Sequence, residues 1–595
     1  MKVSDYVIDF LVKRGVTDIF TVSGGGIMHL TDALARNTGM RYICNFHEQA
    51  CAIAAESYAR VRNGVGACLV TTGPGSTNAL SGIAGAYVDS VPVVVISGQV
   101  RRELIADYSK LRQNGPQEIN IDDMAKPVVK YFTTLMDPKM ARYEMECAWW
   151  HATSGRPGPV WINIPLDVQS SEFDENEAPG FEPPQEASGE DEFKAKVAEA
   201  VEMFRAAKRP VLIGGNGIHL CAAEEKFISF VNKTDAPVLL TVGGVDLLEE
   251  NHPRTMGRFG PLGQRRANFA LQNSDLVLSI GASMSVSSIG FNTSGFAPKA
   301  KRIMVSVDIE DLLKSNYKPD LGIAADAGRF MDEFLKQTAT TEFKISSKWD
   351  DACVRWKERY PTVTEDYLAN KDYVNSYYFS RRLSNFLPEG AVVVTGNSLD
   401  FWSVFQSFEA KANQRIYTNI NYGSMGWDLP AVIGAAVGRP DAVVCIPTGD
   451  GSIQFNLQEL LTIRLNNLPI KIFVLNNLGY ESIRSTQNNF FERRHVGSDF
   501  TSGIGNPDFS KLAAAYGFGY DCINTNDELH KIEQVLKMEG PVLCELKLSP
   551  DQPRSPKTMS VRKPDGTMES RPIEDLFPFL PREEVYENMH LFDGE

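Results

Sequence analysis

The sequence predicts an α/β protein built from three doubly wound parallel-sheet domains. Short apolar segments alternate with helical patterns in three stretches of the chain, as they do in β-α-β units. Polar segments separate these stretches, and 595 residues are too many for a single hydrophobic core. We therefore expect three domains, at residues 1–170, 190–337 and 370–548, and a terminal arm at residues 549–595.

The expected elements follow the apolar runs in order. In the first domain we expect helices at residues 3–14 and 50–62 and strands at residues 18–22, 66–71, 92–97 and 159–164. We expect central strands at residues 210–213, 237–241, 276–280 and 303–307, third-domain strands at 391–395, 442–447 and 470–475, and a helix at 453–465. Polar connections are expected at residues 170–192 and 338–350. The last segment, 549–595, shows no helical period, so we expect an extended arm over the surface or a neighbouring subunit.

Composition and charge argue against several classes of partner. Sixty basic and seventy-five acidic residues give a net charge of -15, which opposes binding to nucleic acid. The nine cysteines show no metal-type spacing, so we expect reduced core residues of a cytoplasmic protein. The N-terminus lacks a cleavable signal pattern, and no apolar run approaches the ~18 residues that span a bilayer, so we expect no membrane association.

The run Gly449-Asp450-Gly451 has the layout of a magnesium-diphosphate site. It follows an apolar strand directly, so we expect it at the carboxyl edge of a parallel sheet, where such sheets bind ligands. The next strand delivers Asn477 beside Asp450. Magnesium takes few oxygen ligands from protein and the rest from phosphates and water, so Asp450, Asn477 and the Gly479 carbonyl are the candidate ligands. Gly-Asp-Gly alone also occurs at ordinary strand ends, and it is the paired Asn476-Asn477 that favours the metal site.

Together these two motifs resemble the signature of the thiamine diphosphate enzymes. The resemblance implies thiamine diphosphate and Mg²⁺ as cofactors, a pyrimidine-binding first domain, a central domain and a diphosphate-binding third domain. In the first domain, His47-Glu48-Gln49-Ala50 resembles the family's His-Glu-x-Ala segment. This implies that Glu48 activates the aminopyrimidine ring, whereas Glu48 by itself also fits a glutamate favoured by a helix N-terminus.

Further segments resemble the acetolactate synthase-like group. The turn at residues 71–78 resembles its Gly-Pro-Gly-x-Thr-Asn turn, which implies that Pro74 and Asn78 contact the cofactor. Residues 423–427 resemble the segment that holds the cofactor bent. The resemblance also implies a site shared between two subunits, so a homodimer is the minimum assembly and a homotetramer stays open. The remaining implied cofactor contacts in the third domain are Gly396, Asn397, Gly423, Met425, Gly449, Gly451 and Ser452; for Met425, simple core packing is an additional reading.

The residues expected around the reacting carbon favour carboligation. Decarboxylases of this family commonly carry a His-His pair and an acidic residue on the helix after the Asn-Asn strand, whereas this chain has no His-His pair and has Ile483 at the acidic position. Gly25 stands where decarboxylases have a polar or acidic side chain and acetolactate synthases have glycine. The resemblance implies an enzyme that decarboxylates pyruvate or a similar 2-oxo acid and transfers the two-carbon unit to a carbonyl acceptor. It also implies acceptor contacts from Gln117 and Lys130, although a surface lysine is the commoner reading of Lys130 alone.

Two departures from the synthase pattern leave questions open. The synthases' Gln-Trp-Gln is replaced by Ser485-Thr486-Gln487, so the acceptor can be a second 2-oxo acid, an aldehyde or a keto-sugar nucleotide. In the central domain, the synthases' Arg-Phe-Asp-Asp-Arg is replaced by residues 283–287, so FAD, another nucleotide and no ligand all stay open. A 2-oxo acid decarboxylase and a flavin-linked oxidase are the alternative enzymes. A non-catalytic paralogue is disfavoured because Glu48 and Asp450 are both present.

Overall fold

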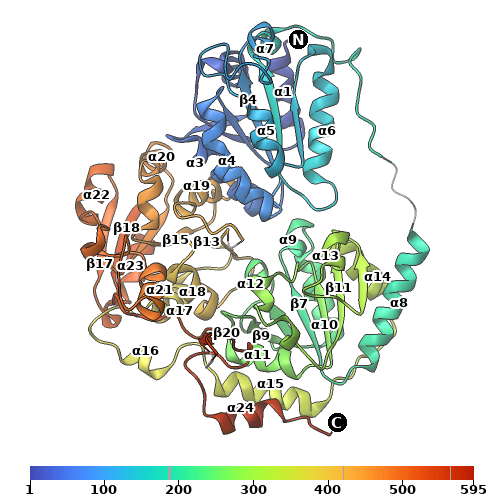
Figure 1. The fold of residues 1–595 in the computed structure, drawn as a ribbon, viewed down its shortest axis with the longest axis vertical. Coiled ribbons are helices and arrows are strands. Elements are labelled where there is room, and N and C mark those ends of the chain that lie inside the picture. The colour runs from blue at the N-terminus through green and yellow to red at the C-terminus, as the bar shows by residue number, and fades with distance from the viewer. Residues whose placement is uncertain (185–188, 420, 563–564, 595) are drawn as a thin grey trace.

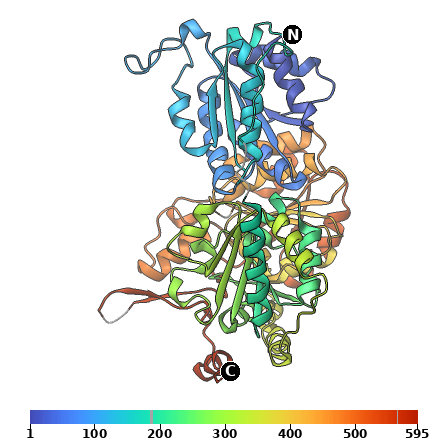
Figure 2. The same cartoon turned by 90° about the vertical axis from the view of Figure 1, so that its right-hand side faces the viewer.

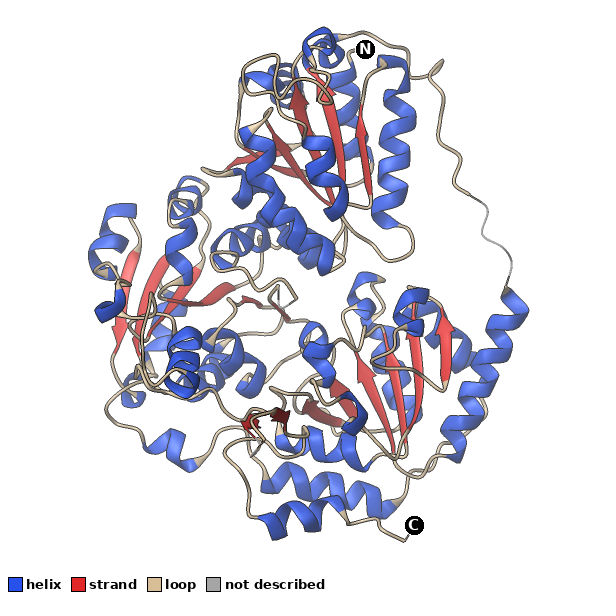
Figure 3. Ribbon diagram, viewed as in Figure 1, coloured by secondary structure: helices blue, strands red, loops and turns tan. Residues whose placement is uncertain are grey.

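The computed structural model describes residues 1–184, 189–419, 421–562 and 565–594 and contains three six-stranded sheets whose strands all pair in parallel (Figure 1). The first unit lies at the top of Figure 1, the central unit at the right and the third unit at the left. Helices cover both faces of each sheet, as Figure 3 shows. The predicted fold class is therefore confirmed.

In each of the three sheets the first strand of the chain lies inside the sheet; the first and third sheets share one strand order, and the central sheet has a different one. The orders are β2-β1-β3-β4-β6-β5, β12-β11-β10-β7-β8-β9 and β14-β13-β15-β16-β18-β17. The first sheet comprises β1 (Asp18–Thr21), β2 (Arg41–Cys44), β3 (Gly66–Val70), β4 (Val93–Gln99), β5 (Tyr131–Thr134) and β6 (Val160–Pro165). The central sheet comprises β7 (Pro210–Gly214), β8 (Val238–Leu240), β9 (Thr255–Arg258), β10 (Leu276–Ile280), β11 (Lys301–Ser306) and β12 (Leu321–Ala324). The third comprises β13 (Val392–Val394), β14 (Arg415–Tyr417), β15 (Val444–Gly449), β16 (Lys471–Asn476), β17 (Gly519–Ile523) and β18 (Val542–Lys547).

The helices form the outer layers of the same three units. The first unit has α1 (Val3–Lys13), α2 (Met28–Arg36), α3 (Glu48–Arg62), α4 (Pro74–Val88), α5 (Ile121–Ala125), α6 (Ala141–Thr153) and α7 (Leu166–Ser170). The central unit has α8 (Glu190–Ala206), α9 (Gly217–Leu220), α10 (Glu224–Thr234), α11 (Arg265–Asn273), α12 (Val286–Ile289), α13 (Ile309–Leu313), α14 (Ala327–Gln337) and α15 (Ser347–Arg359). The third unit has α16 (Glu365–Ala369), α17 (Ser376–Phe386), α18 (Leu399–Ser407), α19 (Asp428–Gly438), α20 (Glu459–Leu465), α21 (Glu481–Phe490), α22 (Phe509–Tyr516) and α23 (Lys531–Lys537).

The first and third units pack together through α3 and α19 and share one hydrophobic core. The two helices approach closely because Gly434 has no side chain: a β-carbon there would lie 2.0 Å from the Ala54 carbonyl oxygen. Polar contacts add to the apolar packing, since Trp427 Nε1 donates to Glu56 at 2.7 Å and Ser57 Oγ donates to the Ala431 carbonyl at 2.5 Å. The carboxyl edges of the first and third sheets are therefore held in a fixed relation within one chain.

Two local expectations are wrong. The segment predicted as one helix over residues 453–465 is a 3₁₀ turn at Ser452–Asn456 followed by α20, which begins only at Glu459. Asn456 Nδ2 donates to the Gly426 carbonyl at 2.7 Å, and that tertiary contact favours the tighter turn over a regular helix. In the predicted polar connection at residues 338–350, α15 already begins at Ser347, because Trp349 is fully buried against the central unit.

The terminal arm is also more ordered than its sequence suggests. It contains the hairpin β19 (Ser560–Arg562) and β20 (Met568–Ser570), which extends away from the body of the molecule in Figure 2, and the helix α24 (Arg582–Met589). Trp356 Nε1 donates to Asn588 at 2.8 Å, and Phe592 packs against Trp349 with ring centroids 5.5 Å apart. The arm therefore completes the core of the central unit of its own chain.

We predict that Phe592→Ala destabilises the central unit. Phe592 is 5% exposed, so its truncation leaves a cavity beside Trp349 and should lower the free energy of unfolding by about 3 kcal/mol. Denaturant unfolding followed by tryptophan fluorescence measures this loss. Phe579→Ala, at a side chain that is 40% exposed, is the matched control and should change stability much less. Equal effects of the two substitutions would contradict the assigned packing.

Candidate active site

The Gly-Asp-Gly run and the Asn-Asn pair meet at the carboxyl edge of the third sheet. Gly449 of β15 pairs in register with Leu475 of β16, and Asp450 N donates to the Leu475 carbonyl at 3.3 Å. Both Asp450 and Asn477 are buried. Burial raises the pKa of the Asp450 carboxyl, and hydrogen bonds from Asn506 and the Gly479 backbone oppose that rise.

The groups on this edge fit a magnesium ion. Asn477 Oδ1 is buried without a hydrogen-bond partner, which is costly for a polar atom unless a ligand satisfies it. The Gly479 N–H donates to Asp450 Oδ2 at 3.1 Å. Gly479 adopts φ +134°, and a β-carbon there would lie 2.4 Å from the Ser498 carbonyl oxygen, so the loop requires glycine. One carboxylate, one amide oxygen and a backbone carbonyl are oxygen ligands of the kind that Mg²⁺ takes from protein.

Asn506 contacts the candidate metal site, although its sequence position did not indicate this. Its Nδ2 donates to Asp450 Oδ2 at 2.6 Å and to Asn476 Oδ1 at 3.0 Å. Gln454 Nε2 in turn donates to Asn506 Oδ1 and to the Asp450 carbonyl, both at 3.2 Å. Asn506 therefore orients one oxygen of the Asp450 carboxylate and leaves the other for a metal. Its distance along the chain from the Asn-Asn pair hid this role.

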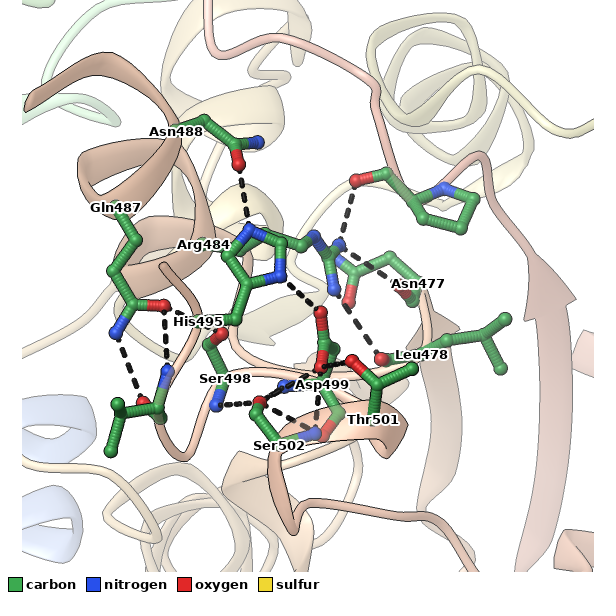
Figure 4. A network of polar contacts seen from close by, with 12 residues as sticks. Asn477, Leu478, Arg484, Gln487, Asn488, His495, Ser498, Asp499, Thr501 and Ser502 are labelled. Atoms are coloured by element: carbon green, nitrogen blue, oxygen red, sulfur yellow. Dashed lines mark hydrogen bonds and ion pairs between the residues drawn. The ribbon is translucent and has the colours of Figure 1, made fainter. Parts of the chain in front are cut away.

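We call residues 477–479, which follow β16, the metal loop. The segment between α21 and Asn506 folds back over this loop (Figure 4). Arg484 donates to the carbonyls of Asn477 and Leu478 at 3.1 and 3.3 Å. His495 lies between Asp499 and Asn488, with its ring nitrogens 2.6 and 2.7 Å from their oxygens. Tyr480 N donates to the Ser498 carbonyl at 2.8 Å. These contacts fix the backbone that carries the candidate metal ligands.

The expected diphosphate contacts gather on the neighbouring strand ends. Asn397 Nδ2 donates to the Gly423 carbonyl, which joins the loop after β13 to the loop before α19. Gly451 lies under the Tyr480 ring, so close that a β-carbon would be 2.2 Å from it. Ser452 Oγ donates to Asp428 at 3.1 Å and accepts from Gly426 N at 2.9 Å. The Ser452 hydroxyl is thus engaged within the protein.

Two buried acids beside Gly396 were also missed. A β-carbon on Gly396 would lie 2.1 Å from Asp400 Oδ2 and 2.8 Å from Asp428 Oδ2, so the two carboxyls lie close together. Asp400 Oδ2 has no hydrogen-bond partner, whereas Asp428 Oδ2 accepts from Thr448 at 2.5 Å. Burial, and then the charge of Asp428, raises the pKa of Asp400 to about 7. Burial also raises the pKa of Asp428, and hydrogen bonds from Thr448 and Ser452 oppose that rise.

The first sheet brings the expected pyrimidine-site residues together at its carboxyl edge. Asn78 Nδ2 donates to Glu48 Oε2 at 2.9 Å, and a β-carbon on Gly75, next to Pro74, would lie 3.3 Å from Glu48 Oε1. Gly73 adopts φ +66°, and a β-carbon there would lie 1.7 Å from the Gln117 carbonyl oxygen. Gln117 therefore lies against the same turn.

The loop that follows β1 approaches this group as well. Gly26 N donates to Thr71 Oγ1 at 3.2 Å. At the neighbouring Gly25, a β-carbon would meet no atom within 4 Å, so this position borders open space in the described chain.

Met425 and Lys130 are the two remaining predicted site residues. Met425 is half-buried between two positive-φ glycines, Gly423 and Gly426, and belongs to no hydrophobic cluster of the described residues. Its side chain is thus not used in a core.

Lys130 precedes β5, so it lies at the amino edge of the first sheet, and its Nζ donates to the Ser154 carbonyl at 2.7 Å. Within the chain, the fold does not bring Lys130 to Glu48, which follows a strand at the opposite edge.

Comparisons with known proteins identify the family. The descriptions "Thiamine pyrophosphate enzyme, N-terminal TPP binding domain", "central domain" and "C-terminal TPP binding domain" match residues 1–125, 197–334 and 396–546, thiamine pyrophosphate being another name for thiamine diphosphate. The chain therefore belongs to the thiamine pyrophosphate enzyme family. Within it, the chain is an enzyme of the acetolactate synthase type.

Its similarity to acetolactate synthases extends over most of the chain. It is 33% identical over 543 residues to the acetolactate synthase large subunit of Parasynechococcus marenigrum (strain WH8102), covering 88% of this chain and 84% of that protein. It is 29% identical over 554 residues to acetolactate synthase isozyme 1 large subunit of Escherichia coli (strain K12), covering 92% and 94%. It is 31% identical over 561 residues to the chloroplastic acetolactate synthase 2 of Nicotiana tabacum, covering 92% and 82%. Within the part of the chain that is described, none of the helices is long and apolar enough to cross a membrane.

We predict that Asn506→Ala weakens Mg²⁺ binding. Loss of the amide frees the Asp450 carboxylate to rotate, and removing a partner of a metal ligand typically weakens affinity by about tenfold or more. Calorimetric titration of Mg²⁺ in the presence of thiamine diphosphate measures this change. Asn524→Ala, at an asparagine that contacts Glu528 instead, should leave the affinity unchanged. Wild-type affinity in Asn506→Ala would contradict the positioning role.

We predict that Asp400→Asn stabilises the protein at pH 8 and less so at pH 4.5. An acid whose pKa is raised on folding is stabilised in its neutral form, so the stability that it contributes is lost as the pH rises from about 4 to about 7. The neutral amide avoids that loss. Unfolding midpoints of both proteins across this pH range provide the test, with the exposed Asp441→Asn as control. A difference independent of pH would refute the assignment of a neutral Asp400.

Proposed function

We propose that this chain is a thiamine diphosphate- and Mg²⁺-dependent carboligase. It decarboxylates pyruvate or a similar 2-oxo acid and transfers the two-carbon unit to a carbonyl acceptor. The observation that carries the proposal is the unpartnered Asn477 Oδ1 beside the buried Asp450, in a family whose domains bind thiamine pyrophosphate. When bound, the cofactor supplies the carbanion chemistry.

Each chain residue then has a defined task. Asp450, Asn477 and the Gly479 carbonyl would hold Mg²⁺, with Gly396, Asn397, Gly423, Gly449, Gly451 and Ser452 around the diphosphate. Met425, which belongs to no hydrophobic cluster of the described residues, would support the bound cofactor. Glu48 would hold the proton that the aminopyrimidine ring needs, and Asn78 orients its carboxyl through the 2.9 Å hydrogen bond.

The surroundings of the reacting carbon favour a carbonyl acceptor over a proton. Ile483 presents an apolar side chain that is 46% exposed on α21, and the space at Gly25 is open. An apolar, roomy site does not supply a proton and admits a second substrate. Gln117, on the turn beside Pro74, is the proposed acceptor contact. The alternatives, a 2-oxo acid decarboxylase and a flavin-linked oxidase, differ in their products.

We further propose a homodimer of cytoplasmic chains as the minimum assembly, with the first domain of one chain facing the third domain of the other. Large apolar side chains are exposed near both half-sites: Phe46 near Glu48 and Leu478 in the metal loop, at 49 and 55% exposure. A second copy would cover them. Sedimentation velocity distinguishes the dimer from a tetramer.

A cavity of about 350 Å³ lies at the carboxyl edge of the central sheet, where Arg60 and Arg156 of the first unit and Thr418 of the third unit also line it. Gly217, Gly281 and Ser306 line it, and Asp308 on its wall is paired with Arg156 at 3.2 Å. This edge of a doubly wound sheet suits a nucleotide. Absorbance of the purified protein distinguishes FAD, which is yellow, from a colourless nucleotide.

We predict that Glu48→Gln reduces carbon dioxide release from pyruvate at least a hundredfold, which corresponds to ~2.7 kcal/mol in transition-state free energy. The amide cannot exchange the proton, whereas it can still accept from Asn78, so cofactor binding measured by calorimetry should persist. The exposed Glu182→Gln should behave as wild type. Mass spectrometry of the products from pyruvate with each acceptor class tests carboligation. Acetaldehyde as the sole product would favour the decarboxylase, and full activity of Glu48→Gln would refute the mechanism.

A further inference from the structure

A second cavity lies behind the metal loop, between α21 and the terminal arm. It has a volume of about 230 Å³. The charged side chains of its lining are three cations, Arg484, Arg554 and Lys557, and two acids, Glu481 and Asp551; Ser485, Asn488 and Phe577 also line it. Ile483, which the proposed carboligase places near the reacting carbon, lies on the opposite face of the helix, because residues 484, 485 and 488 repeat at helical spacing. The cavity is therefore distinct from the space around the reacting carbon.

Positive charge gathers in this cavity, although the chain as a whole carries a net charge of -15. Arg484 uses its guanidinium on backbone carbonyls, including that of Pro550 at 2.6 Å. Lys557 and Arg554 remain as cations, and the buried Glu481 lies 2.9 Å from Arg554.

The donors in the cavity are not fully used. Among the described residues, the Lys557 ammonium has no hydrogen-bond or ion-pair partner, and burial and Arg554 lower its pKa. Arg554 Nε lies 2.9 Å from Glu481 Oε2, but the two groups are not aligned for a hydrogen bond, and Arg554 Nε is buried. Asn488 uses its Oδ1 with His495, which leaves its amide nitrogen as a donor. Cationic and amide donors around a small polar cavity suit the oxygens of a phosphate group.

We propose that the cavity between α21 and the arm is a phosphoryl-binding site, in which Lys557, Arg554 and Asn488 bind the oxygens of a phosphate group. The group belongs either to free phosphate or a monoester, or to a nucleoside diphosphate. Binding there would clamp the arm onto α21. Because Arg484 joins the carbonyls of Asn477, Leu478 and Pro550, the bound anion would also stiffen the metal loop.

The test is calorimetric titration of inorganic phosphate into the protein saturated with thiamine diphosphate and Mg²⁺, so that the cofactor site does not take the probe. We expect one site on the wild type, a dissociation constant about tenfold or more higher in Lys557→Gln, and recovery in Lys557→Arg. Lys537→Gln, at an exposed lysine on α23, should bind as the wild type does. Acetate at equal concentration should not compete.

A nucleoside diphosphate that displaces phosphate would assign the group to a nucleotide, and failure to displace would assign it to free phosphate or a monoester. Thermal unfolding of each variant checks that the fold is intact. No phosphate binding by the wild type, or equal binding by Lys557→Gln, would overturn the proposal. Neither result would depend on carboligase activity.

Discussion

An amide oxygen that is buried without a protein partner is the feature on which the site depends. Asn477 Oδ1 would cost roughly 1–3 kcal/mol if nothing satisfied it, and it lies beside the Asp450 carboxylate, whose pKa burial raises. A divalent cation resolves both problems, because it coordinates the amide oxygen and stabilises the ionised Asp450. The parallel pairing of β15 with β16 brings these two groups to one edge.

The surrounding loops keep that arrangement in place. Asn506 and the Gly479 N–H hold one carboxylate oxygen, and Arg484 holds the backbone carbonyls of the metal loop. On the neighbouring strand, the paired acids Asp400 and Asp428 would repel a diphosphate if both were ionised, and burial opposes their ionisation. Burial thus raises the pKa of all three acids at this site.

Sequence patterns predict the parts of this structure that depend on local periodicity. Apolar strands followed by glycine place Asp450 and Asn477 at strand ends, and the three parallel sheets are confirmed. Local sequence patterns do not show which residues from distant loops contact the site. Asn506 lies 56 residues from Asp450, and Asp428 reaches Gly396 only in the folded chain. Tertiary contacts also replace the predicted helix after Gly451 by a 3₁₀ turn. The helix α24 has only a weak apolar pattern, and it contacts α15 through the hydrogen bond from Trp356 to Asn588. The domain boundaries and the site roles stay predictions. The order of elements already indicated the position of Lys130, because a residue that precedes a parallel strand lies at the opposite edge of the sheet from residues that follow the strands.

The most direct test is a crystal structure of the protein grown with thiamine diphosphate and Mn²⁺, with the metal located by anomalous scattering. We expect one peak within about 2.0–2.3 Å of an Asp450 carboxylate oxygen, Asn477 Oδ1 and the Gly479 carbonyl oxygen. A metal bound elsewhere, or Asn477 Oδ1 turned away from it, would contradict the account.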